Sequence, residues 1–407
     1  MSSTDENKLV PKLRFPEFNN DGGWNADKVG NLILTITPPK KLLSSNYLPN
    51  GDYPIIDQSK SFYCGWTNDK DAIITNDLPL IVFGDHTCIL KLAYEPFAQG
   101  ADGIKILKSN ELIDRIFIYH FIIYNPVKQE EYKRHFSILK EKIVLFPNIK
   151  TGEQQKIASF LSSLDKLING ESQKLEELKA HKKGLMQNLF PQEDEKVPRI
   201  RFKEFKKSGE WGEKKLEEIS ENVMYGMNSA AVEFDGENKY IRITDIDEDT
   251  RSFTPNPLTS PEGPLEERYS VNVGDLLFAR TGASVGKSYL HRKENGKIYF
   301  AGFLIRFTIK DAIPYFVYAQ TLTNHYQKWI LATSVRSGQP GINAEEYKSY
   351  PIFLPPDKER KEQQKISDCL LSLDDIIKAQ SQKIETLKEH KKSLMQNLFP
   401  NFNGVSV

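Results

Sequence analysis

The chain has 407 residues, 39% of them hydrophobic, and its 55 basic side chains are balanced by 55 acidic ones. This length exceeds a single typical core, so we expect two or three domains. The zero net charge excludes a domain that binds nucleic acid through an overall basic excess, and any DNA contact must come from local patches or from partner proteins. No apolar stretch is long enough to span a bilayer, no signal-peptide pattern opens the chain, and the three cysteines form no CxxC pair. We therefore expect a cytoplasmic protein without a disulfide framework or a zinc finger.

The first block of the chain mixes signals for strands and helices. Apolar runs at residues 78–83 and 104–107 are typical of buried strands, and residues 115–124 have helical spacing. Asp-His-Thr-Cys at residues 85–88 follows the first of these strands, but one histidine and one thiol lack the further ligands that a metal site requires. We interpret this segment as a surface loop.

A long helix is predicted at residues 153–191. Its apolar side chains recur at alternating steps of three and four residues, which gives the narrow stripe typical of a coiled coil. They are Leu164, Ile168, Leu175, Leu178, Leu185 and Leu189. Thr151 with Gln154 predicts a capping box at the start of the helix, and Pro191 ends it.

The second block predicts strands at residues 240–244, at 275–279 and within 297–308, followed by a helix over 315–329. Both blocks therefore predict α+β domains of a size that supports an independent core. The segment GASVGKS at residues 282–288 is similar to a phosphate-binding P-loop, but it has three residues between its glycines where that motif needs four. This spacing favours a glycine turn over a nucleotide site.

Two polar loops of the second block suit contact with DNA. One is the glycine turn after the strand at residues 275–279, where side chains that point outward would reach phosphate oxygens or base edges. The other is the segment at residues 334–343, just before the next long helix. The first loop supplies Arg280, Thr281, Ser284 and Lys287, and the second supplies Arg336, Gln339 and Asn343. For any one of these residues the alternative is a solvated surface loop without a DNA contact.

A second long helix, at residues 362–400, repeats the first. Both copies run from EQQKI to LMQNLFP, and roughly two-thirds of the aligned positions are identical. Val10 and Val197 begin another repeated pair, VPKLRFPEF and VPRIRFKEF, so the chain is a tandem duplication of a variable block and a helix. The two narrow stripes would cover each other in an antiparallel coiled coil. The alternative is that each helix packs onto its own preceding block.

The sequence offers no convincing catalytic motif. It contains neither a glycine-rich dinucleotide fingerprint after a strand nor the Asn-Pro-Pro-aromatic tetrapeptide that holds a flipped adenine in amino-methyltransferases. Asp357 and Glu389 suggest a nuclease-like set of carboxylates only superficially, because Glu389 lies inside the repeated helix. We therefore predict neither catalytic residues nor a metal site.

Together these segments resemble the specificity subunit of a type I restriction-modification system. The resemblance rests on the repeated helices, the paired openings and the segments GDLLFARTGASVGK and SGQPGINAEEYKSYPIFLPP, and it covers residues 10–400. It implies two α+β target recognition domains, residues 1–152 and 192–361, each followed by a conserved spacer helix. The spacer helices would be residues 153–191 and residues 362–407, the latter including a C-terminal tail.

The resemblance implies a subunit without catalysis of its own that reads a bipartite, asymmetric site in double-stranded DNA. Two methyltransferase subunits would bind it and methylate adenine N6 with S-adenosylmethionine, and restriction subunits with ATP and magnesium would cleave unmodified DNA. The first block lacks the GDLLFARTG and SGQPGIN segments, and its candidate contacts are Lys60, His86, Lys133, Arg134 and His135. An interaction scaffold, an autonomous enzyme and a specificity subunit without a working partner are the rival hypotheses.

Overall fold

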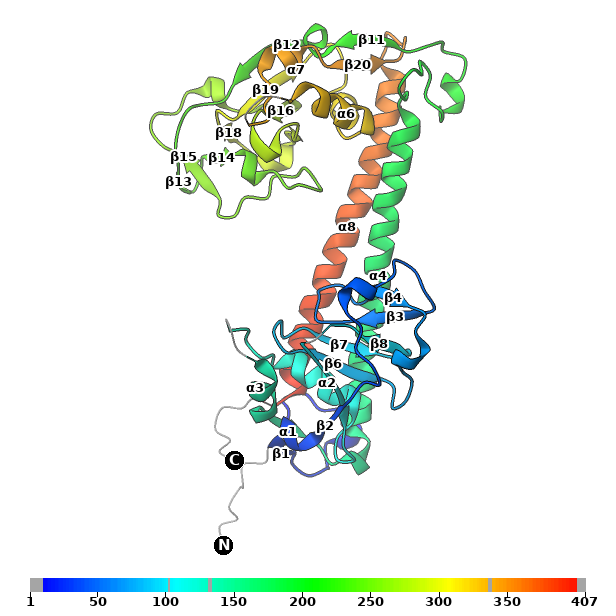
Figure 1. The fold of residues 1–407 in the computed structure, drawn as a ribbon. Helices are drawn as coiled ribbons and strands as arrows, with labels where there is room; N and C mark the ends of the chain where they lie inside the picture. The colour runs from blue at the N-terminus through cyan, green and yellow to red at the C-terminus, as the bar shows by residue number, and fades with distance from the viewer. Residues whose placement is uncertain (1–9, 102, 131–133, 336–338, 401–407) are drawn as a thin grey trace. The chain divides into compact units, whose positions relative to one another are not determined.

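The computed structural model describes residues 10–101, 103–130, 134–335 and 339–400. The chain forms two compact units: unit 1 consists of residues 1–173 and 381–407, and unit 2 of residues 174–380. Two long helices, α4 (Glu153–Leu189) and α8 (Lys361–Leu398), are drawn as unbroken ribbons in Figure 1. Each of these helices therefore starts in one unit and ends in the other.

Unit 1 contains two four-stranded sheets. The first is antiparallel with the order β2-β9-β6-β7, the second has the order β4-β3-β8-β5 with β3 and β8 parallel, and β1 pairs separately with β10. The strands are β1 (Asn25–Lys28), β2 (Ile33–Ile36), β3 (Tyr53–Ile56), β4 (Gly65–Thr67), β5 (Ile73–Ile74), β6 (Leu80–Gly84), β7 (Leu90–Ala93), β8 (Phe97–Gln99), β9 (Ile104–Ser109) and β10 (Ile143–Phe146). The shorter helices are α1 (Val29–Leu32), α2 (Arg115–Tyr124) and α3 (His135–Glu141).

Unit 2 repeats the antiparallel sheet of unit 1 and two of its strand pairs with different residues. Its antiparallel sheet β12-β19-β16-β17 answers to β2-β9-β6-β7, the parallel pair β14–β18 answers to β3–β8, and β11–β20 answers to β1–β10, while β13 pairs with β15. The strands are β11 (Gly212–Lys215), β12 (Ser220–Tyr225), β13 (Ala231–Glu233), β14 (Lys239–Ile241), β15 (Thr259–Pro261), β16 (Asp275–Ala279), β17 (Ser288–Leu290), β18 (Ile298–Phe300), β19 (Leu304–Ile309) and β20 (Pro351–Leu354). The shorter helices are α5 (Pro314–Gln320), α6 (Asn324–Thr333) and α7 (Ala344–Lys348).

Strands β6 and β16 stand at the same place in the two antiparallel sheets, and the sequence predicts both. Every residue of each strand is buried, as expected for uninterrupted apolar runs. Helix α2 has its predicted bounds because Asp114 caps it: Asp114 Oδ1 accepts hydrogen bonds from Ile116 N at 3.0 Å and Phe117 N at 2.9 Å.

Each unit builds its hydrophobic core from both long helices. The start of one helix and the end of the other enter the same cluster of buried side chains. The contributors to unit 1 are Ile157, Leu161, Met395 and Leu398, with Phe399 directly after α8, and those to unit 2 are Ile366, Leu370, Met186 and Leu189, with Phe190 directly after α4. The start of each long helix thus packs onto its own preceding block, as in the alternative stated in the sequence analysis. The end of the same helix completes the core of the other unit.

The long helices also exchange ion pairs within each unit. In unit 1 Lys391 of α8 pairs with Asp165 of α4, and in unit 2 Lys182 of α4 pairs with Asp374 of α8. Asp165 and Asp374 are corresponding residues of the repeat, and so are Lys182 and Lys391. The two ion pairs are therefore reciprocal.

The repeated openings are held to the repeated helix starts. Arg14 donates from Nε and Nη2 to the two carboxylate oxygens of Glu153 at 2.7 and 2.6 Å, and Arg201 does the same to Glu362 at 2.6 and 2.7 Å. Both glutamate side chains are fully buried, so each depends on its arginine fork for its charge to be compensated. These contacts give a physical reason for both repeated segments to occur in both units.

The helix predicted over residues 315–329 is wrong in one respect, because the structure divides it into α5 and α6. Thr323 caps α6 through its side-chain oxygen, which accepts from Tyr326 N at 3.4 Å. A threonine cap starts a new helix where apolar spacing alone indicates a continuous one.

The predicted capping box of Thr151 and Gln154 is also wrong. The side chain of Gln154 is fully buried, accepts from Asp114 N at 2.6 Å, and donates to the carbonyl oxygens of Leu112 and Pro147 at 3.1 and 2.7 Å. Its amide therefore satisfies backbone groups of the preceding block rather than the start of its own helix.

Candidate nucleic-acid interface

In unit 2 the two loops selected from the sequence lie against each other. Gly282 N, in the turn after β16, donates to Pro340 O at 3.0 Å, and Ile342 N donates back to Arg280 O at 2.9 Å. The backbone of one loop thus fixes the backbone of the other, and side chains from both can act on a common ligand.

Thr281, Ser284 and Gln339 border this junction. Thr281 forms an isolated β-bridge with Gly341, and a Cβ at Gly282, whose φ is +70°, would lie 2.8 Å from Gln339 Nε2. The side chain of Gln339 is exposed, whereas Thr281 and Ser284 are half-buried. The structure therefore brings these three predicted residues together at the surface of unit 2.

Arg280 lies between two aromatic rings. Its Cζ is 5.1 Å from the ring centroid of Tyr225 and 5.7 Å from that of Phe303. The side chain is half-buried, and its buried Nε has no hydrogen-bond partner. Attraction to the two ring faces holds the guanidinium without using its hydrogen-bond donors.

Asn343 serves the fold as the cap of α7. Its Oδ1 accepts from Glu346 N at 2.9 Å, and its own N donates to Glu346 Oε2 at 2.8 Å, which completes a capping box. The side chain is exposed, and its oxygen already accepts one hydrogen bond, so the amide nitrogen is the group most available for a contact with a base. Arg336 lies outside the described residues.

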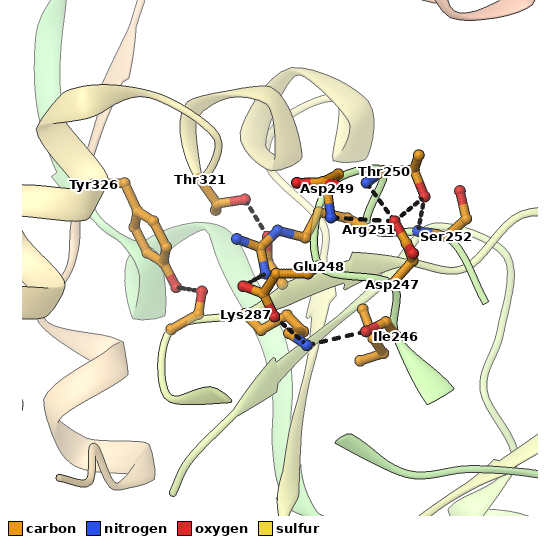
Figure 2. A network of polar contacts seen from close by, with 12 residues as sticks. Ile246, Asp247, Glu248, Asp249, Thr250, Arg251, Ser252, Lys287, Thr321 and Tyr326 are labelled. Carbon is orange, nitrogen blue, oxygen red and sulfur yellow. Dashed lines mark hydrogen bonds and ion pairs between the residues drawn. The ribbon is translucent and has the colours of Figure 1, made fainter. Parts of the chain in front are cut away.

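Lys287 points into unit 2, and the prediction that it points outward is wrong. Its side chain is only 7% exposed, and its Nζ donates to Ile246 O at 3.0 Å and pairs with Glu248 Oε2 at 2.7 Å (Figure 2). The hydrogen bond from Lys287 is the main cause that lowers the pKa of Glu248. The chain reverses at Gly286, whose φ is +83°, and returns the lysine toward β17. Its role is to tie the loop after β14 to the hairpin of β16 and β17.

In unit 1 the corresponding loops also meet. Asp85 O, after β6, accepts from His135 N at 2.9 Å and from His135 Nδ1 at 2.8 Å, and Asp85 Oδ1 accepts from Phe136 N at 2.8 Å. His135 Nε2 accepts from Glu130 N at 2.9 Å, so both ring nitrogens are used, and the side chain is only 1% exposed. The prediction of His135 as a DNA contact is therefore wrong, because this histidine holds the two loops together.

Three predicted residues of unit 1 are exposed, and one lies outside the described residues. The exposed residues are Lys60, His86 and Arg134, and the residue outside is Lys133. Thr87 Oγ1 donates to Gln58 O at 3.0 Å, which ties the loop of His86 to the loop of Lys60. Unit 1 thus presents a cationic and an imidazole side chain from two adjoining loops.

Sequence reasoning missed Lys91, which organises this loop cluster. It is 4% exposed in β7, and its Nζ donates to the carbonyl oxygens of Asp57, Ser61 and Phe62 at 2.8, 2.5 and 3.2 Å. Burial lowers the pKa of Lys91, and the nearby Asp57 carboxylate opposes that shift. Lys91 ties the loop after β3 to the hairpin of β6 and β7, as Lys287 does in unit 2. A lysine inside the otherwise apolar strand LKLA is the signal that could have revealed it.

The chemistry of these loops suits recognition. Their exposed side chains offer guanidinium, ammonium, amide and imidazole groups, which bond phosphate oxygens and base edges. Within the described part of the chain, no group of three or more His, Cys, Asp and Glu side chains could hold a metal ion. Among the same residues, no helix combines the length and the apolar content that crossing a membrane requires.

A family model decides the identity. The model of the type I restriction modification DNA specificity domain matches the chain twice, at residues 23–180 and at residues 208–389. The chain belongs to this family. The double match confirms both the resemblance seen in the sequence and the tandem duplication, and it identifies the chain as a DNA specificity subunit of the type I restriction-modification family.

Individual relatives of this specificity subunit match along its whole length. The type I restriction enzyme MjaVIII specificity subunit of Methanocaldococcus jannaschii is 23% identical over 420 residues, which cover 96% of this chain and 94% of the relative. The crystal structure of a type I restriction-modification S subunit from M. genitalium has a TM-score of 0.61 at 17% identity and covers 97% of this chain and 100% of that chain. This likeness shows that the two chains share a fold.

Proposed function

We propose that this specificity subunit reads a bipartite, asymmetric DNA target, one half-site with each unit, and directs partner subunits to it. The observation that carries the proposal is that the two units hold different loops on the same frame. Strands β6 and β16 occupy the same place in sheets of the same strand order, yet Asp85 follows one and Arg280 the other. Equal frames with unlike loops fit two half-sites of unlike sequence.

The long helices would set the distance between the half-sites as an antiparallel coiled coil. The reciprocal ion pairs support this arrangement. From Asp165 to Lys182 the residue numbers rise along α4, while those of their partners on α8 fall from Lys391 to Asp374. This is the order of contacts expected for antiparallel helices. Charged pairs in an apolar seam favour one register over its alternatives. A helix of 37 residues at about 1.5 Å each is about 55 Å long.

The partners in this proposal are two methyltransferase subunits, which bring S-adenosylmethionine and methylate adenine N6, and restriction subunits, which use ATP and magnesium to cleave unmodified DNA in the cytoplasm. The specificity subunit supplies no catalytic residue. Exposed apolar side chains recur at corresponding positions of the two openings, which suits two copies of one partner. They are Val10, Leu13, Val197 and Ile200, exposed by 44, 44, 42 and 47%.

Methylome sequencing tests the proposal in a methylation-free host that expresses the cognate methyltransferase subunit with and without this chain. We expect new N6-methyladenine in one bipartite motif, only when the chain is present. No new motif, although both proteins are folded and bound to each other, would overturn the proposal and favour an interaction scaffold.

Two changes to the chain test how the reading is divided. Exchanging residues 19–150 for the corresponding block of another specificity subunit is expected to alter one half-site only, and changes in both would contradict independent reading.

Adding one heptad after Ser172 and another after Ser381, the corresponding position, keeps the apolar stripes of the two long helices aligned. Seven residues add about 10.5 Å, so we expect a spacer longer by about three base pairs of about 3.4 Å each. An unchanged spacer would contradict a coiled coil that sets the distance.

A further inference from the structure

Arg280 differs from other arginines of unit 2 in what its guanidinium contacts. Arg306 donates to the carbonyl oxygens of Arg268 and Ser270 at 3.0 and 2.6 Å, and Arg242 forks a carboxylate at 2.8 Å with each of two nitrogens. For Arg280, by contrast, neither terminal nitrogen has a hydrogen bond or a carboxylate partner among the described residues, and the Nε is buried. The two terminal nitrogens are therefore available to a ligand.

The protein nevertheless holds Arg280 firmly. Its N donates to Phe303 O at 3.1 Å, its O accepts from Ile342 N at 2.9 Å, and its Cζ lies 5.1 and 5.7 Å from the rings of Tyr225 and Phe303. The hydroxyl of Tyr225 is itself fixed, because it accepts from Ala344 N at 3.0 Å. A side chain that is already ordered loses little conformational entropy when it binds.

The rings that contact Arg280 are exposed to solvent, and the arginine has no counterpart in unit 1. Tyr225 is 40% exposed and Phe303 is 55% exposed, and both flank the junction of the two variable loops. The corresponding residue in unit 1 is Asp85, whose carboxylate is occupied by Phe136 N at 2.8 Å. A contact with the phosphate backbone would serve both units equally, whereas a group present in only one of the two equal frames suits a contact that reads sequence.

We propose that Arg280 recognises the N7 and O6 edge of a guanine in the half-site read by unit 2. The planar fork of an arginine matches these two acceptors, which lie together in the major groove. The inference rests on the proposed function, because it assumes that unit 2 reads one half-site.

Methylome sequencing of the full chain with its methyltransferase subunit tests the inference, with the half-sites assigned by the block exchange described above. We expect the motif of the unchanged chain to contain a guanine, on either strand, in the half-site of unit 2. Arg280→Gln should reduce the preference for that guanine by roughly 5- to 150-fold and leave every position of the other half-site unchanged. If Arg280→Gln does not fold, Phe303→Leu removes one supporting ring at an exposed position, and a partial loss at the same base pair is expected.

The matched control is Arg268→Gln, which removes an exposed arginine whose Cζ lies 4.8 Å from the ring of Tyr269 but which pairs with Glu266 at 2.9 Å. We expect this control to leave the motif unchanged. A unit 2 half-site without guanine, or an Arg280→Gln variant with an unaltered motif, would overturn the inference. An even loss of methylation at every site would also overturn it, in favour of a phosphate contact. The absence of any motif with the unchanged chain would instead refute the proposed function itself.

Discussion

Phe399→Ala tests whether the end of the second long helix belongs to the core of the first block. Phe399 is 1% exposed, and its ring centroid lies 5.4 Å from that of Phe117, 5.6 Å from that of Phe121 and 5.2 Å from that of Tyr124. All three partners belong to α2, although they are far from Phe399 in the sequence. The substitution should therefore weaken unit 1 rather than the block that precedes Phe399 in the chain.

The expected magnitude follows from burial. Truncating a core phenylalanine to alanine costs about 3–5 kcal/mol, a large share of the about 5–15 kcal/mol that stabilises a typical domain. A loss of about 4 kcal/mol raises the population of the open state by about a thousandfold, and amide exchange that depends on opening accelerates by the same factor.

Hydrogen exchange followed by mass spectrometry measures this effect peptide by peptide. In Phe399→Ala we expect faster exchange in α2 and β6, with β16 and β19 still protected. Phe190→Ala is the matched variant: its ring lies 6.2 Å from Trp211 and 5.3 Å from Phe316, and it should give the reverse pattern. Equal acceleration in both units for either variant would refute the assignment of each helix end to a separate core.

Four further substitutions, the last of them a matched control, test individual features of the frame. Arg201→Ala leaves the fully buried Glu362 without its partner and should cost about 3–5 kcal/mol in chemical denaturation, and a loss below about 1 kcal/mol would contradict a buried ion pair. Burial lowers the pKa of His120 to about 3, so folding favours the neutral imidazole. The free energy of unfolding therefore falls as the pH drops below about 6.5, by about 2 kcal/mol at about pH 5. His120→Gln should therefore show a smaller drop in melting temperature between about pH 7 and about pH 5 than the unchanged chain, and an equal drop would refute this cause. Gly286→Ala should destabilise unit 2 by about 1–3 kcal/mol in urea unfolding, because φ at Gly286 is +83° and a Cβ would lie 2.8 Å from a side chain of α6. Gly170→Ala is the control: a Cβ there would have nothing within 4 Å, and the substitution should stabilise α4 by about 1 kcal/mol.

The parts of the fold that the sequence predicts are those decided by local patterns. β16 and α2 have the expected bounds because an uninterrupted apolar run and a capped helix need only their own residues. The capping box at Gln154 failed because this side chain is bonded to the backbone of Leu112 and Pro147, which are brought to it only by folding. Local signals cannot reveal such competition between partners.

The candidate site shows the same division. The sequence places the variable loops correctly relative to their strands, and the structure brings the loops together in both units. It does not predict the direction of the side chains, because Lys287 turns inward toward Glu248 and His135 toward Asp85, and each partner comes from another segment. Whether a polar residue of a loop faces solvent thus depends on acceptors that only the tertiary structure supplies.

The repeated segments indicate more than the presence of two helices, because they also contact one another. Their identical residues contact one another, as in Arg14 with Glu153 and Asp165 with Lys391, so a change in one member leaves a partly or fully buried charge without its partner. Identical segments that recur together in both halves of a chain therefore indicate contacts between those segments. Part of the attachment of the loops after β6 and β16 uses backbone groups, as where Gly282 N donates to Pro340 O and His135 N donates to Asp85 O, and such bonds permit different side chains at the exposed positions between them. In the proposed function, this difference lets the bases that are read change without any change to the frame that positions the two readers.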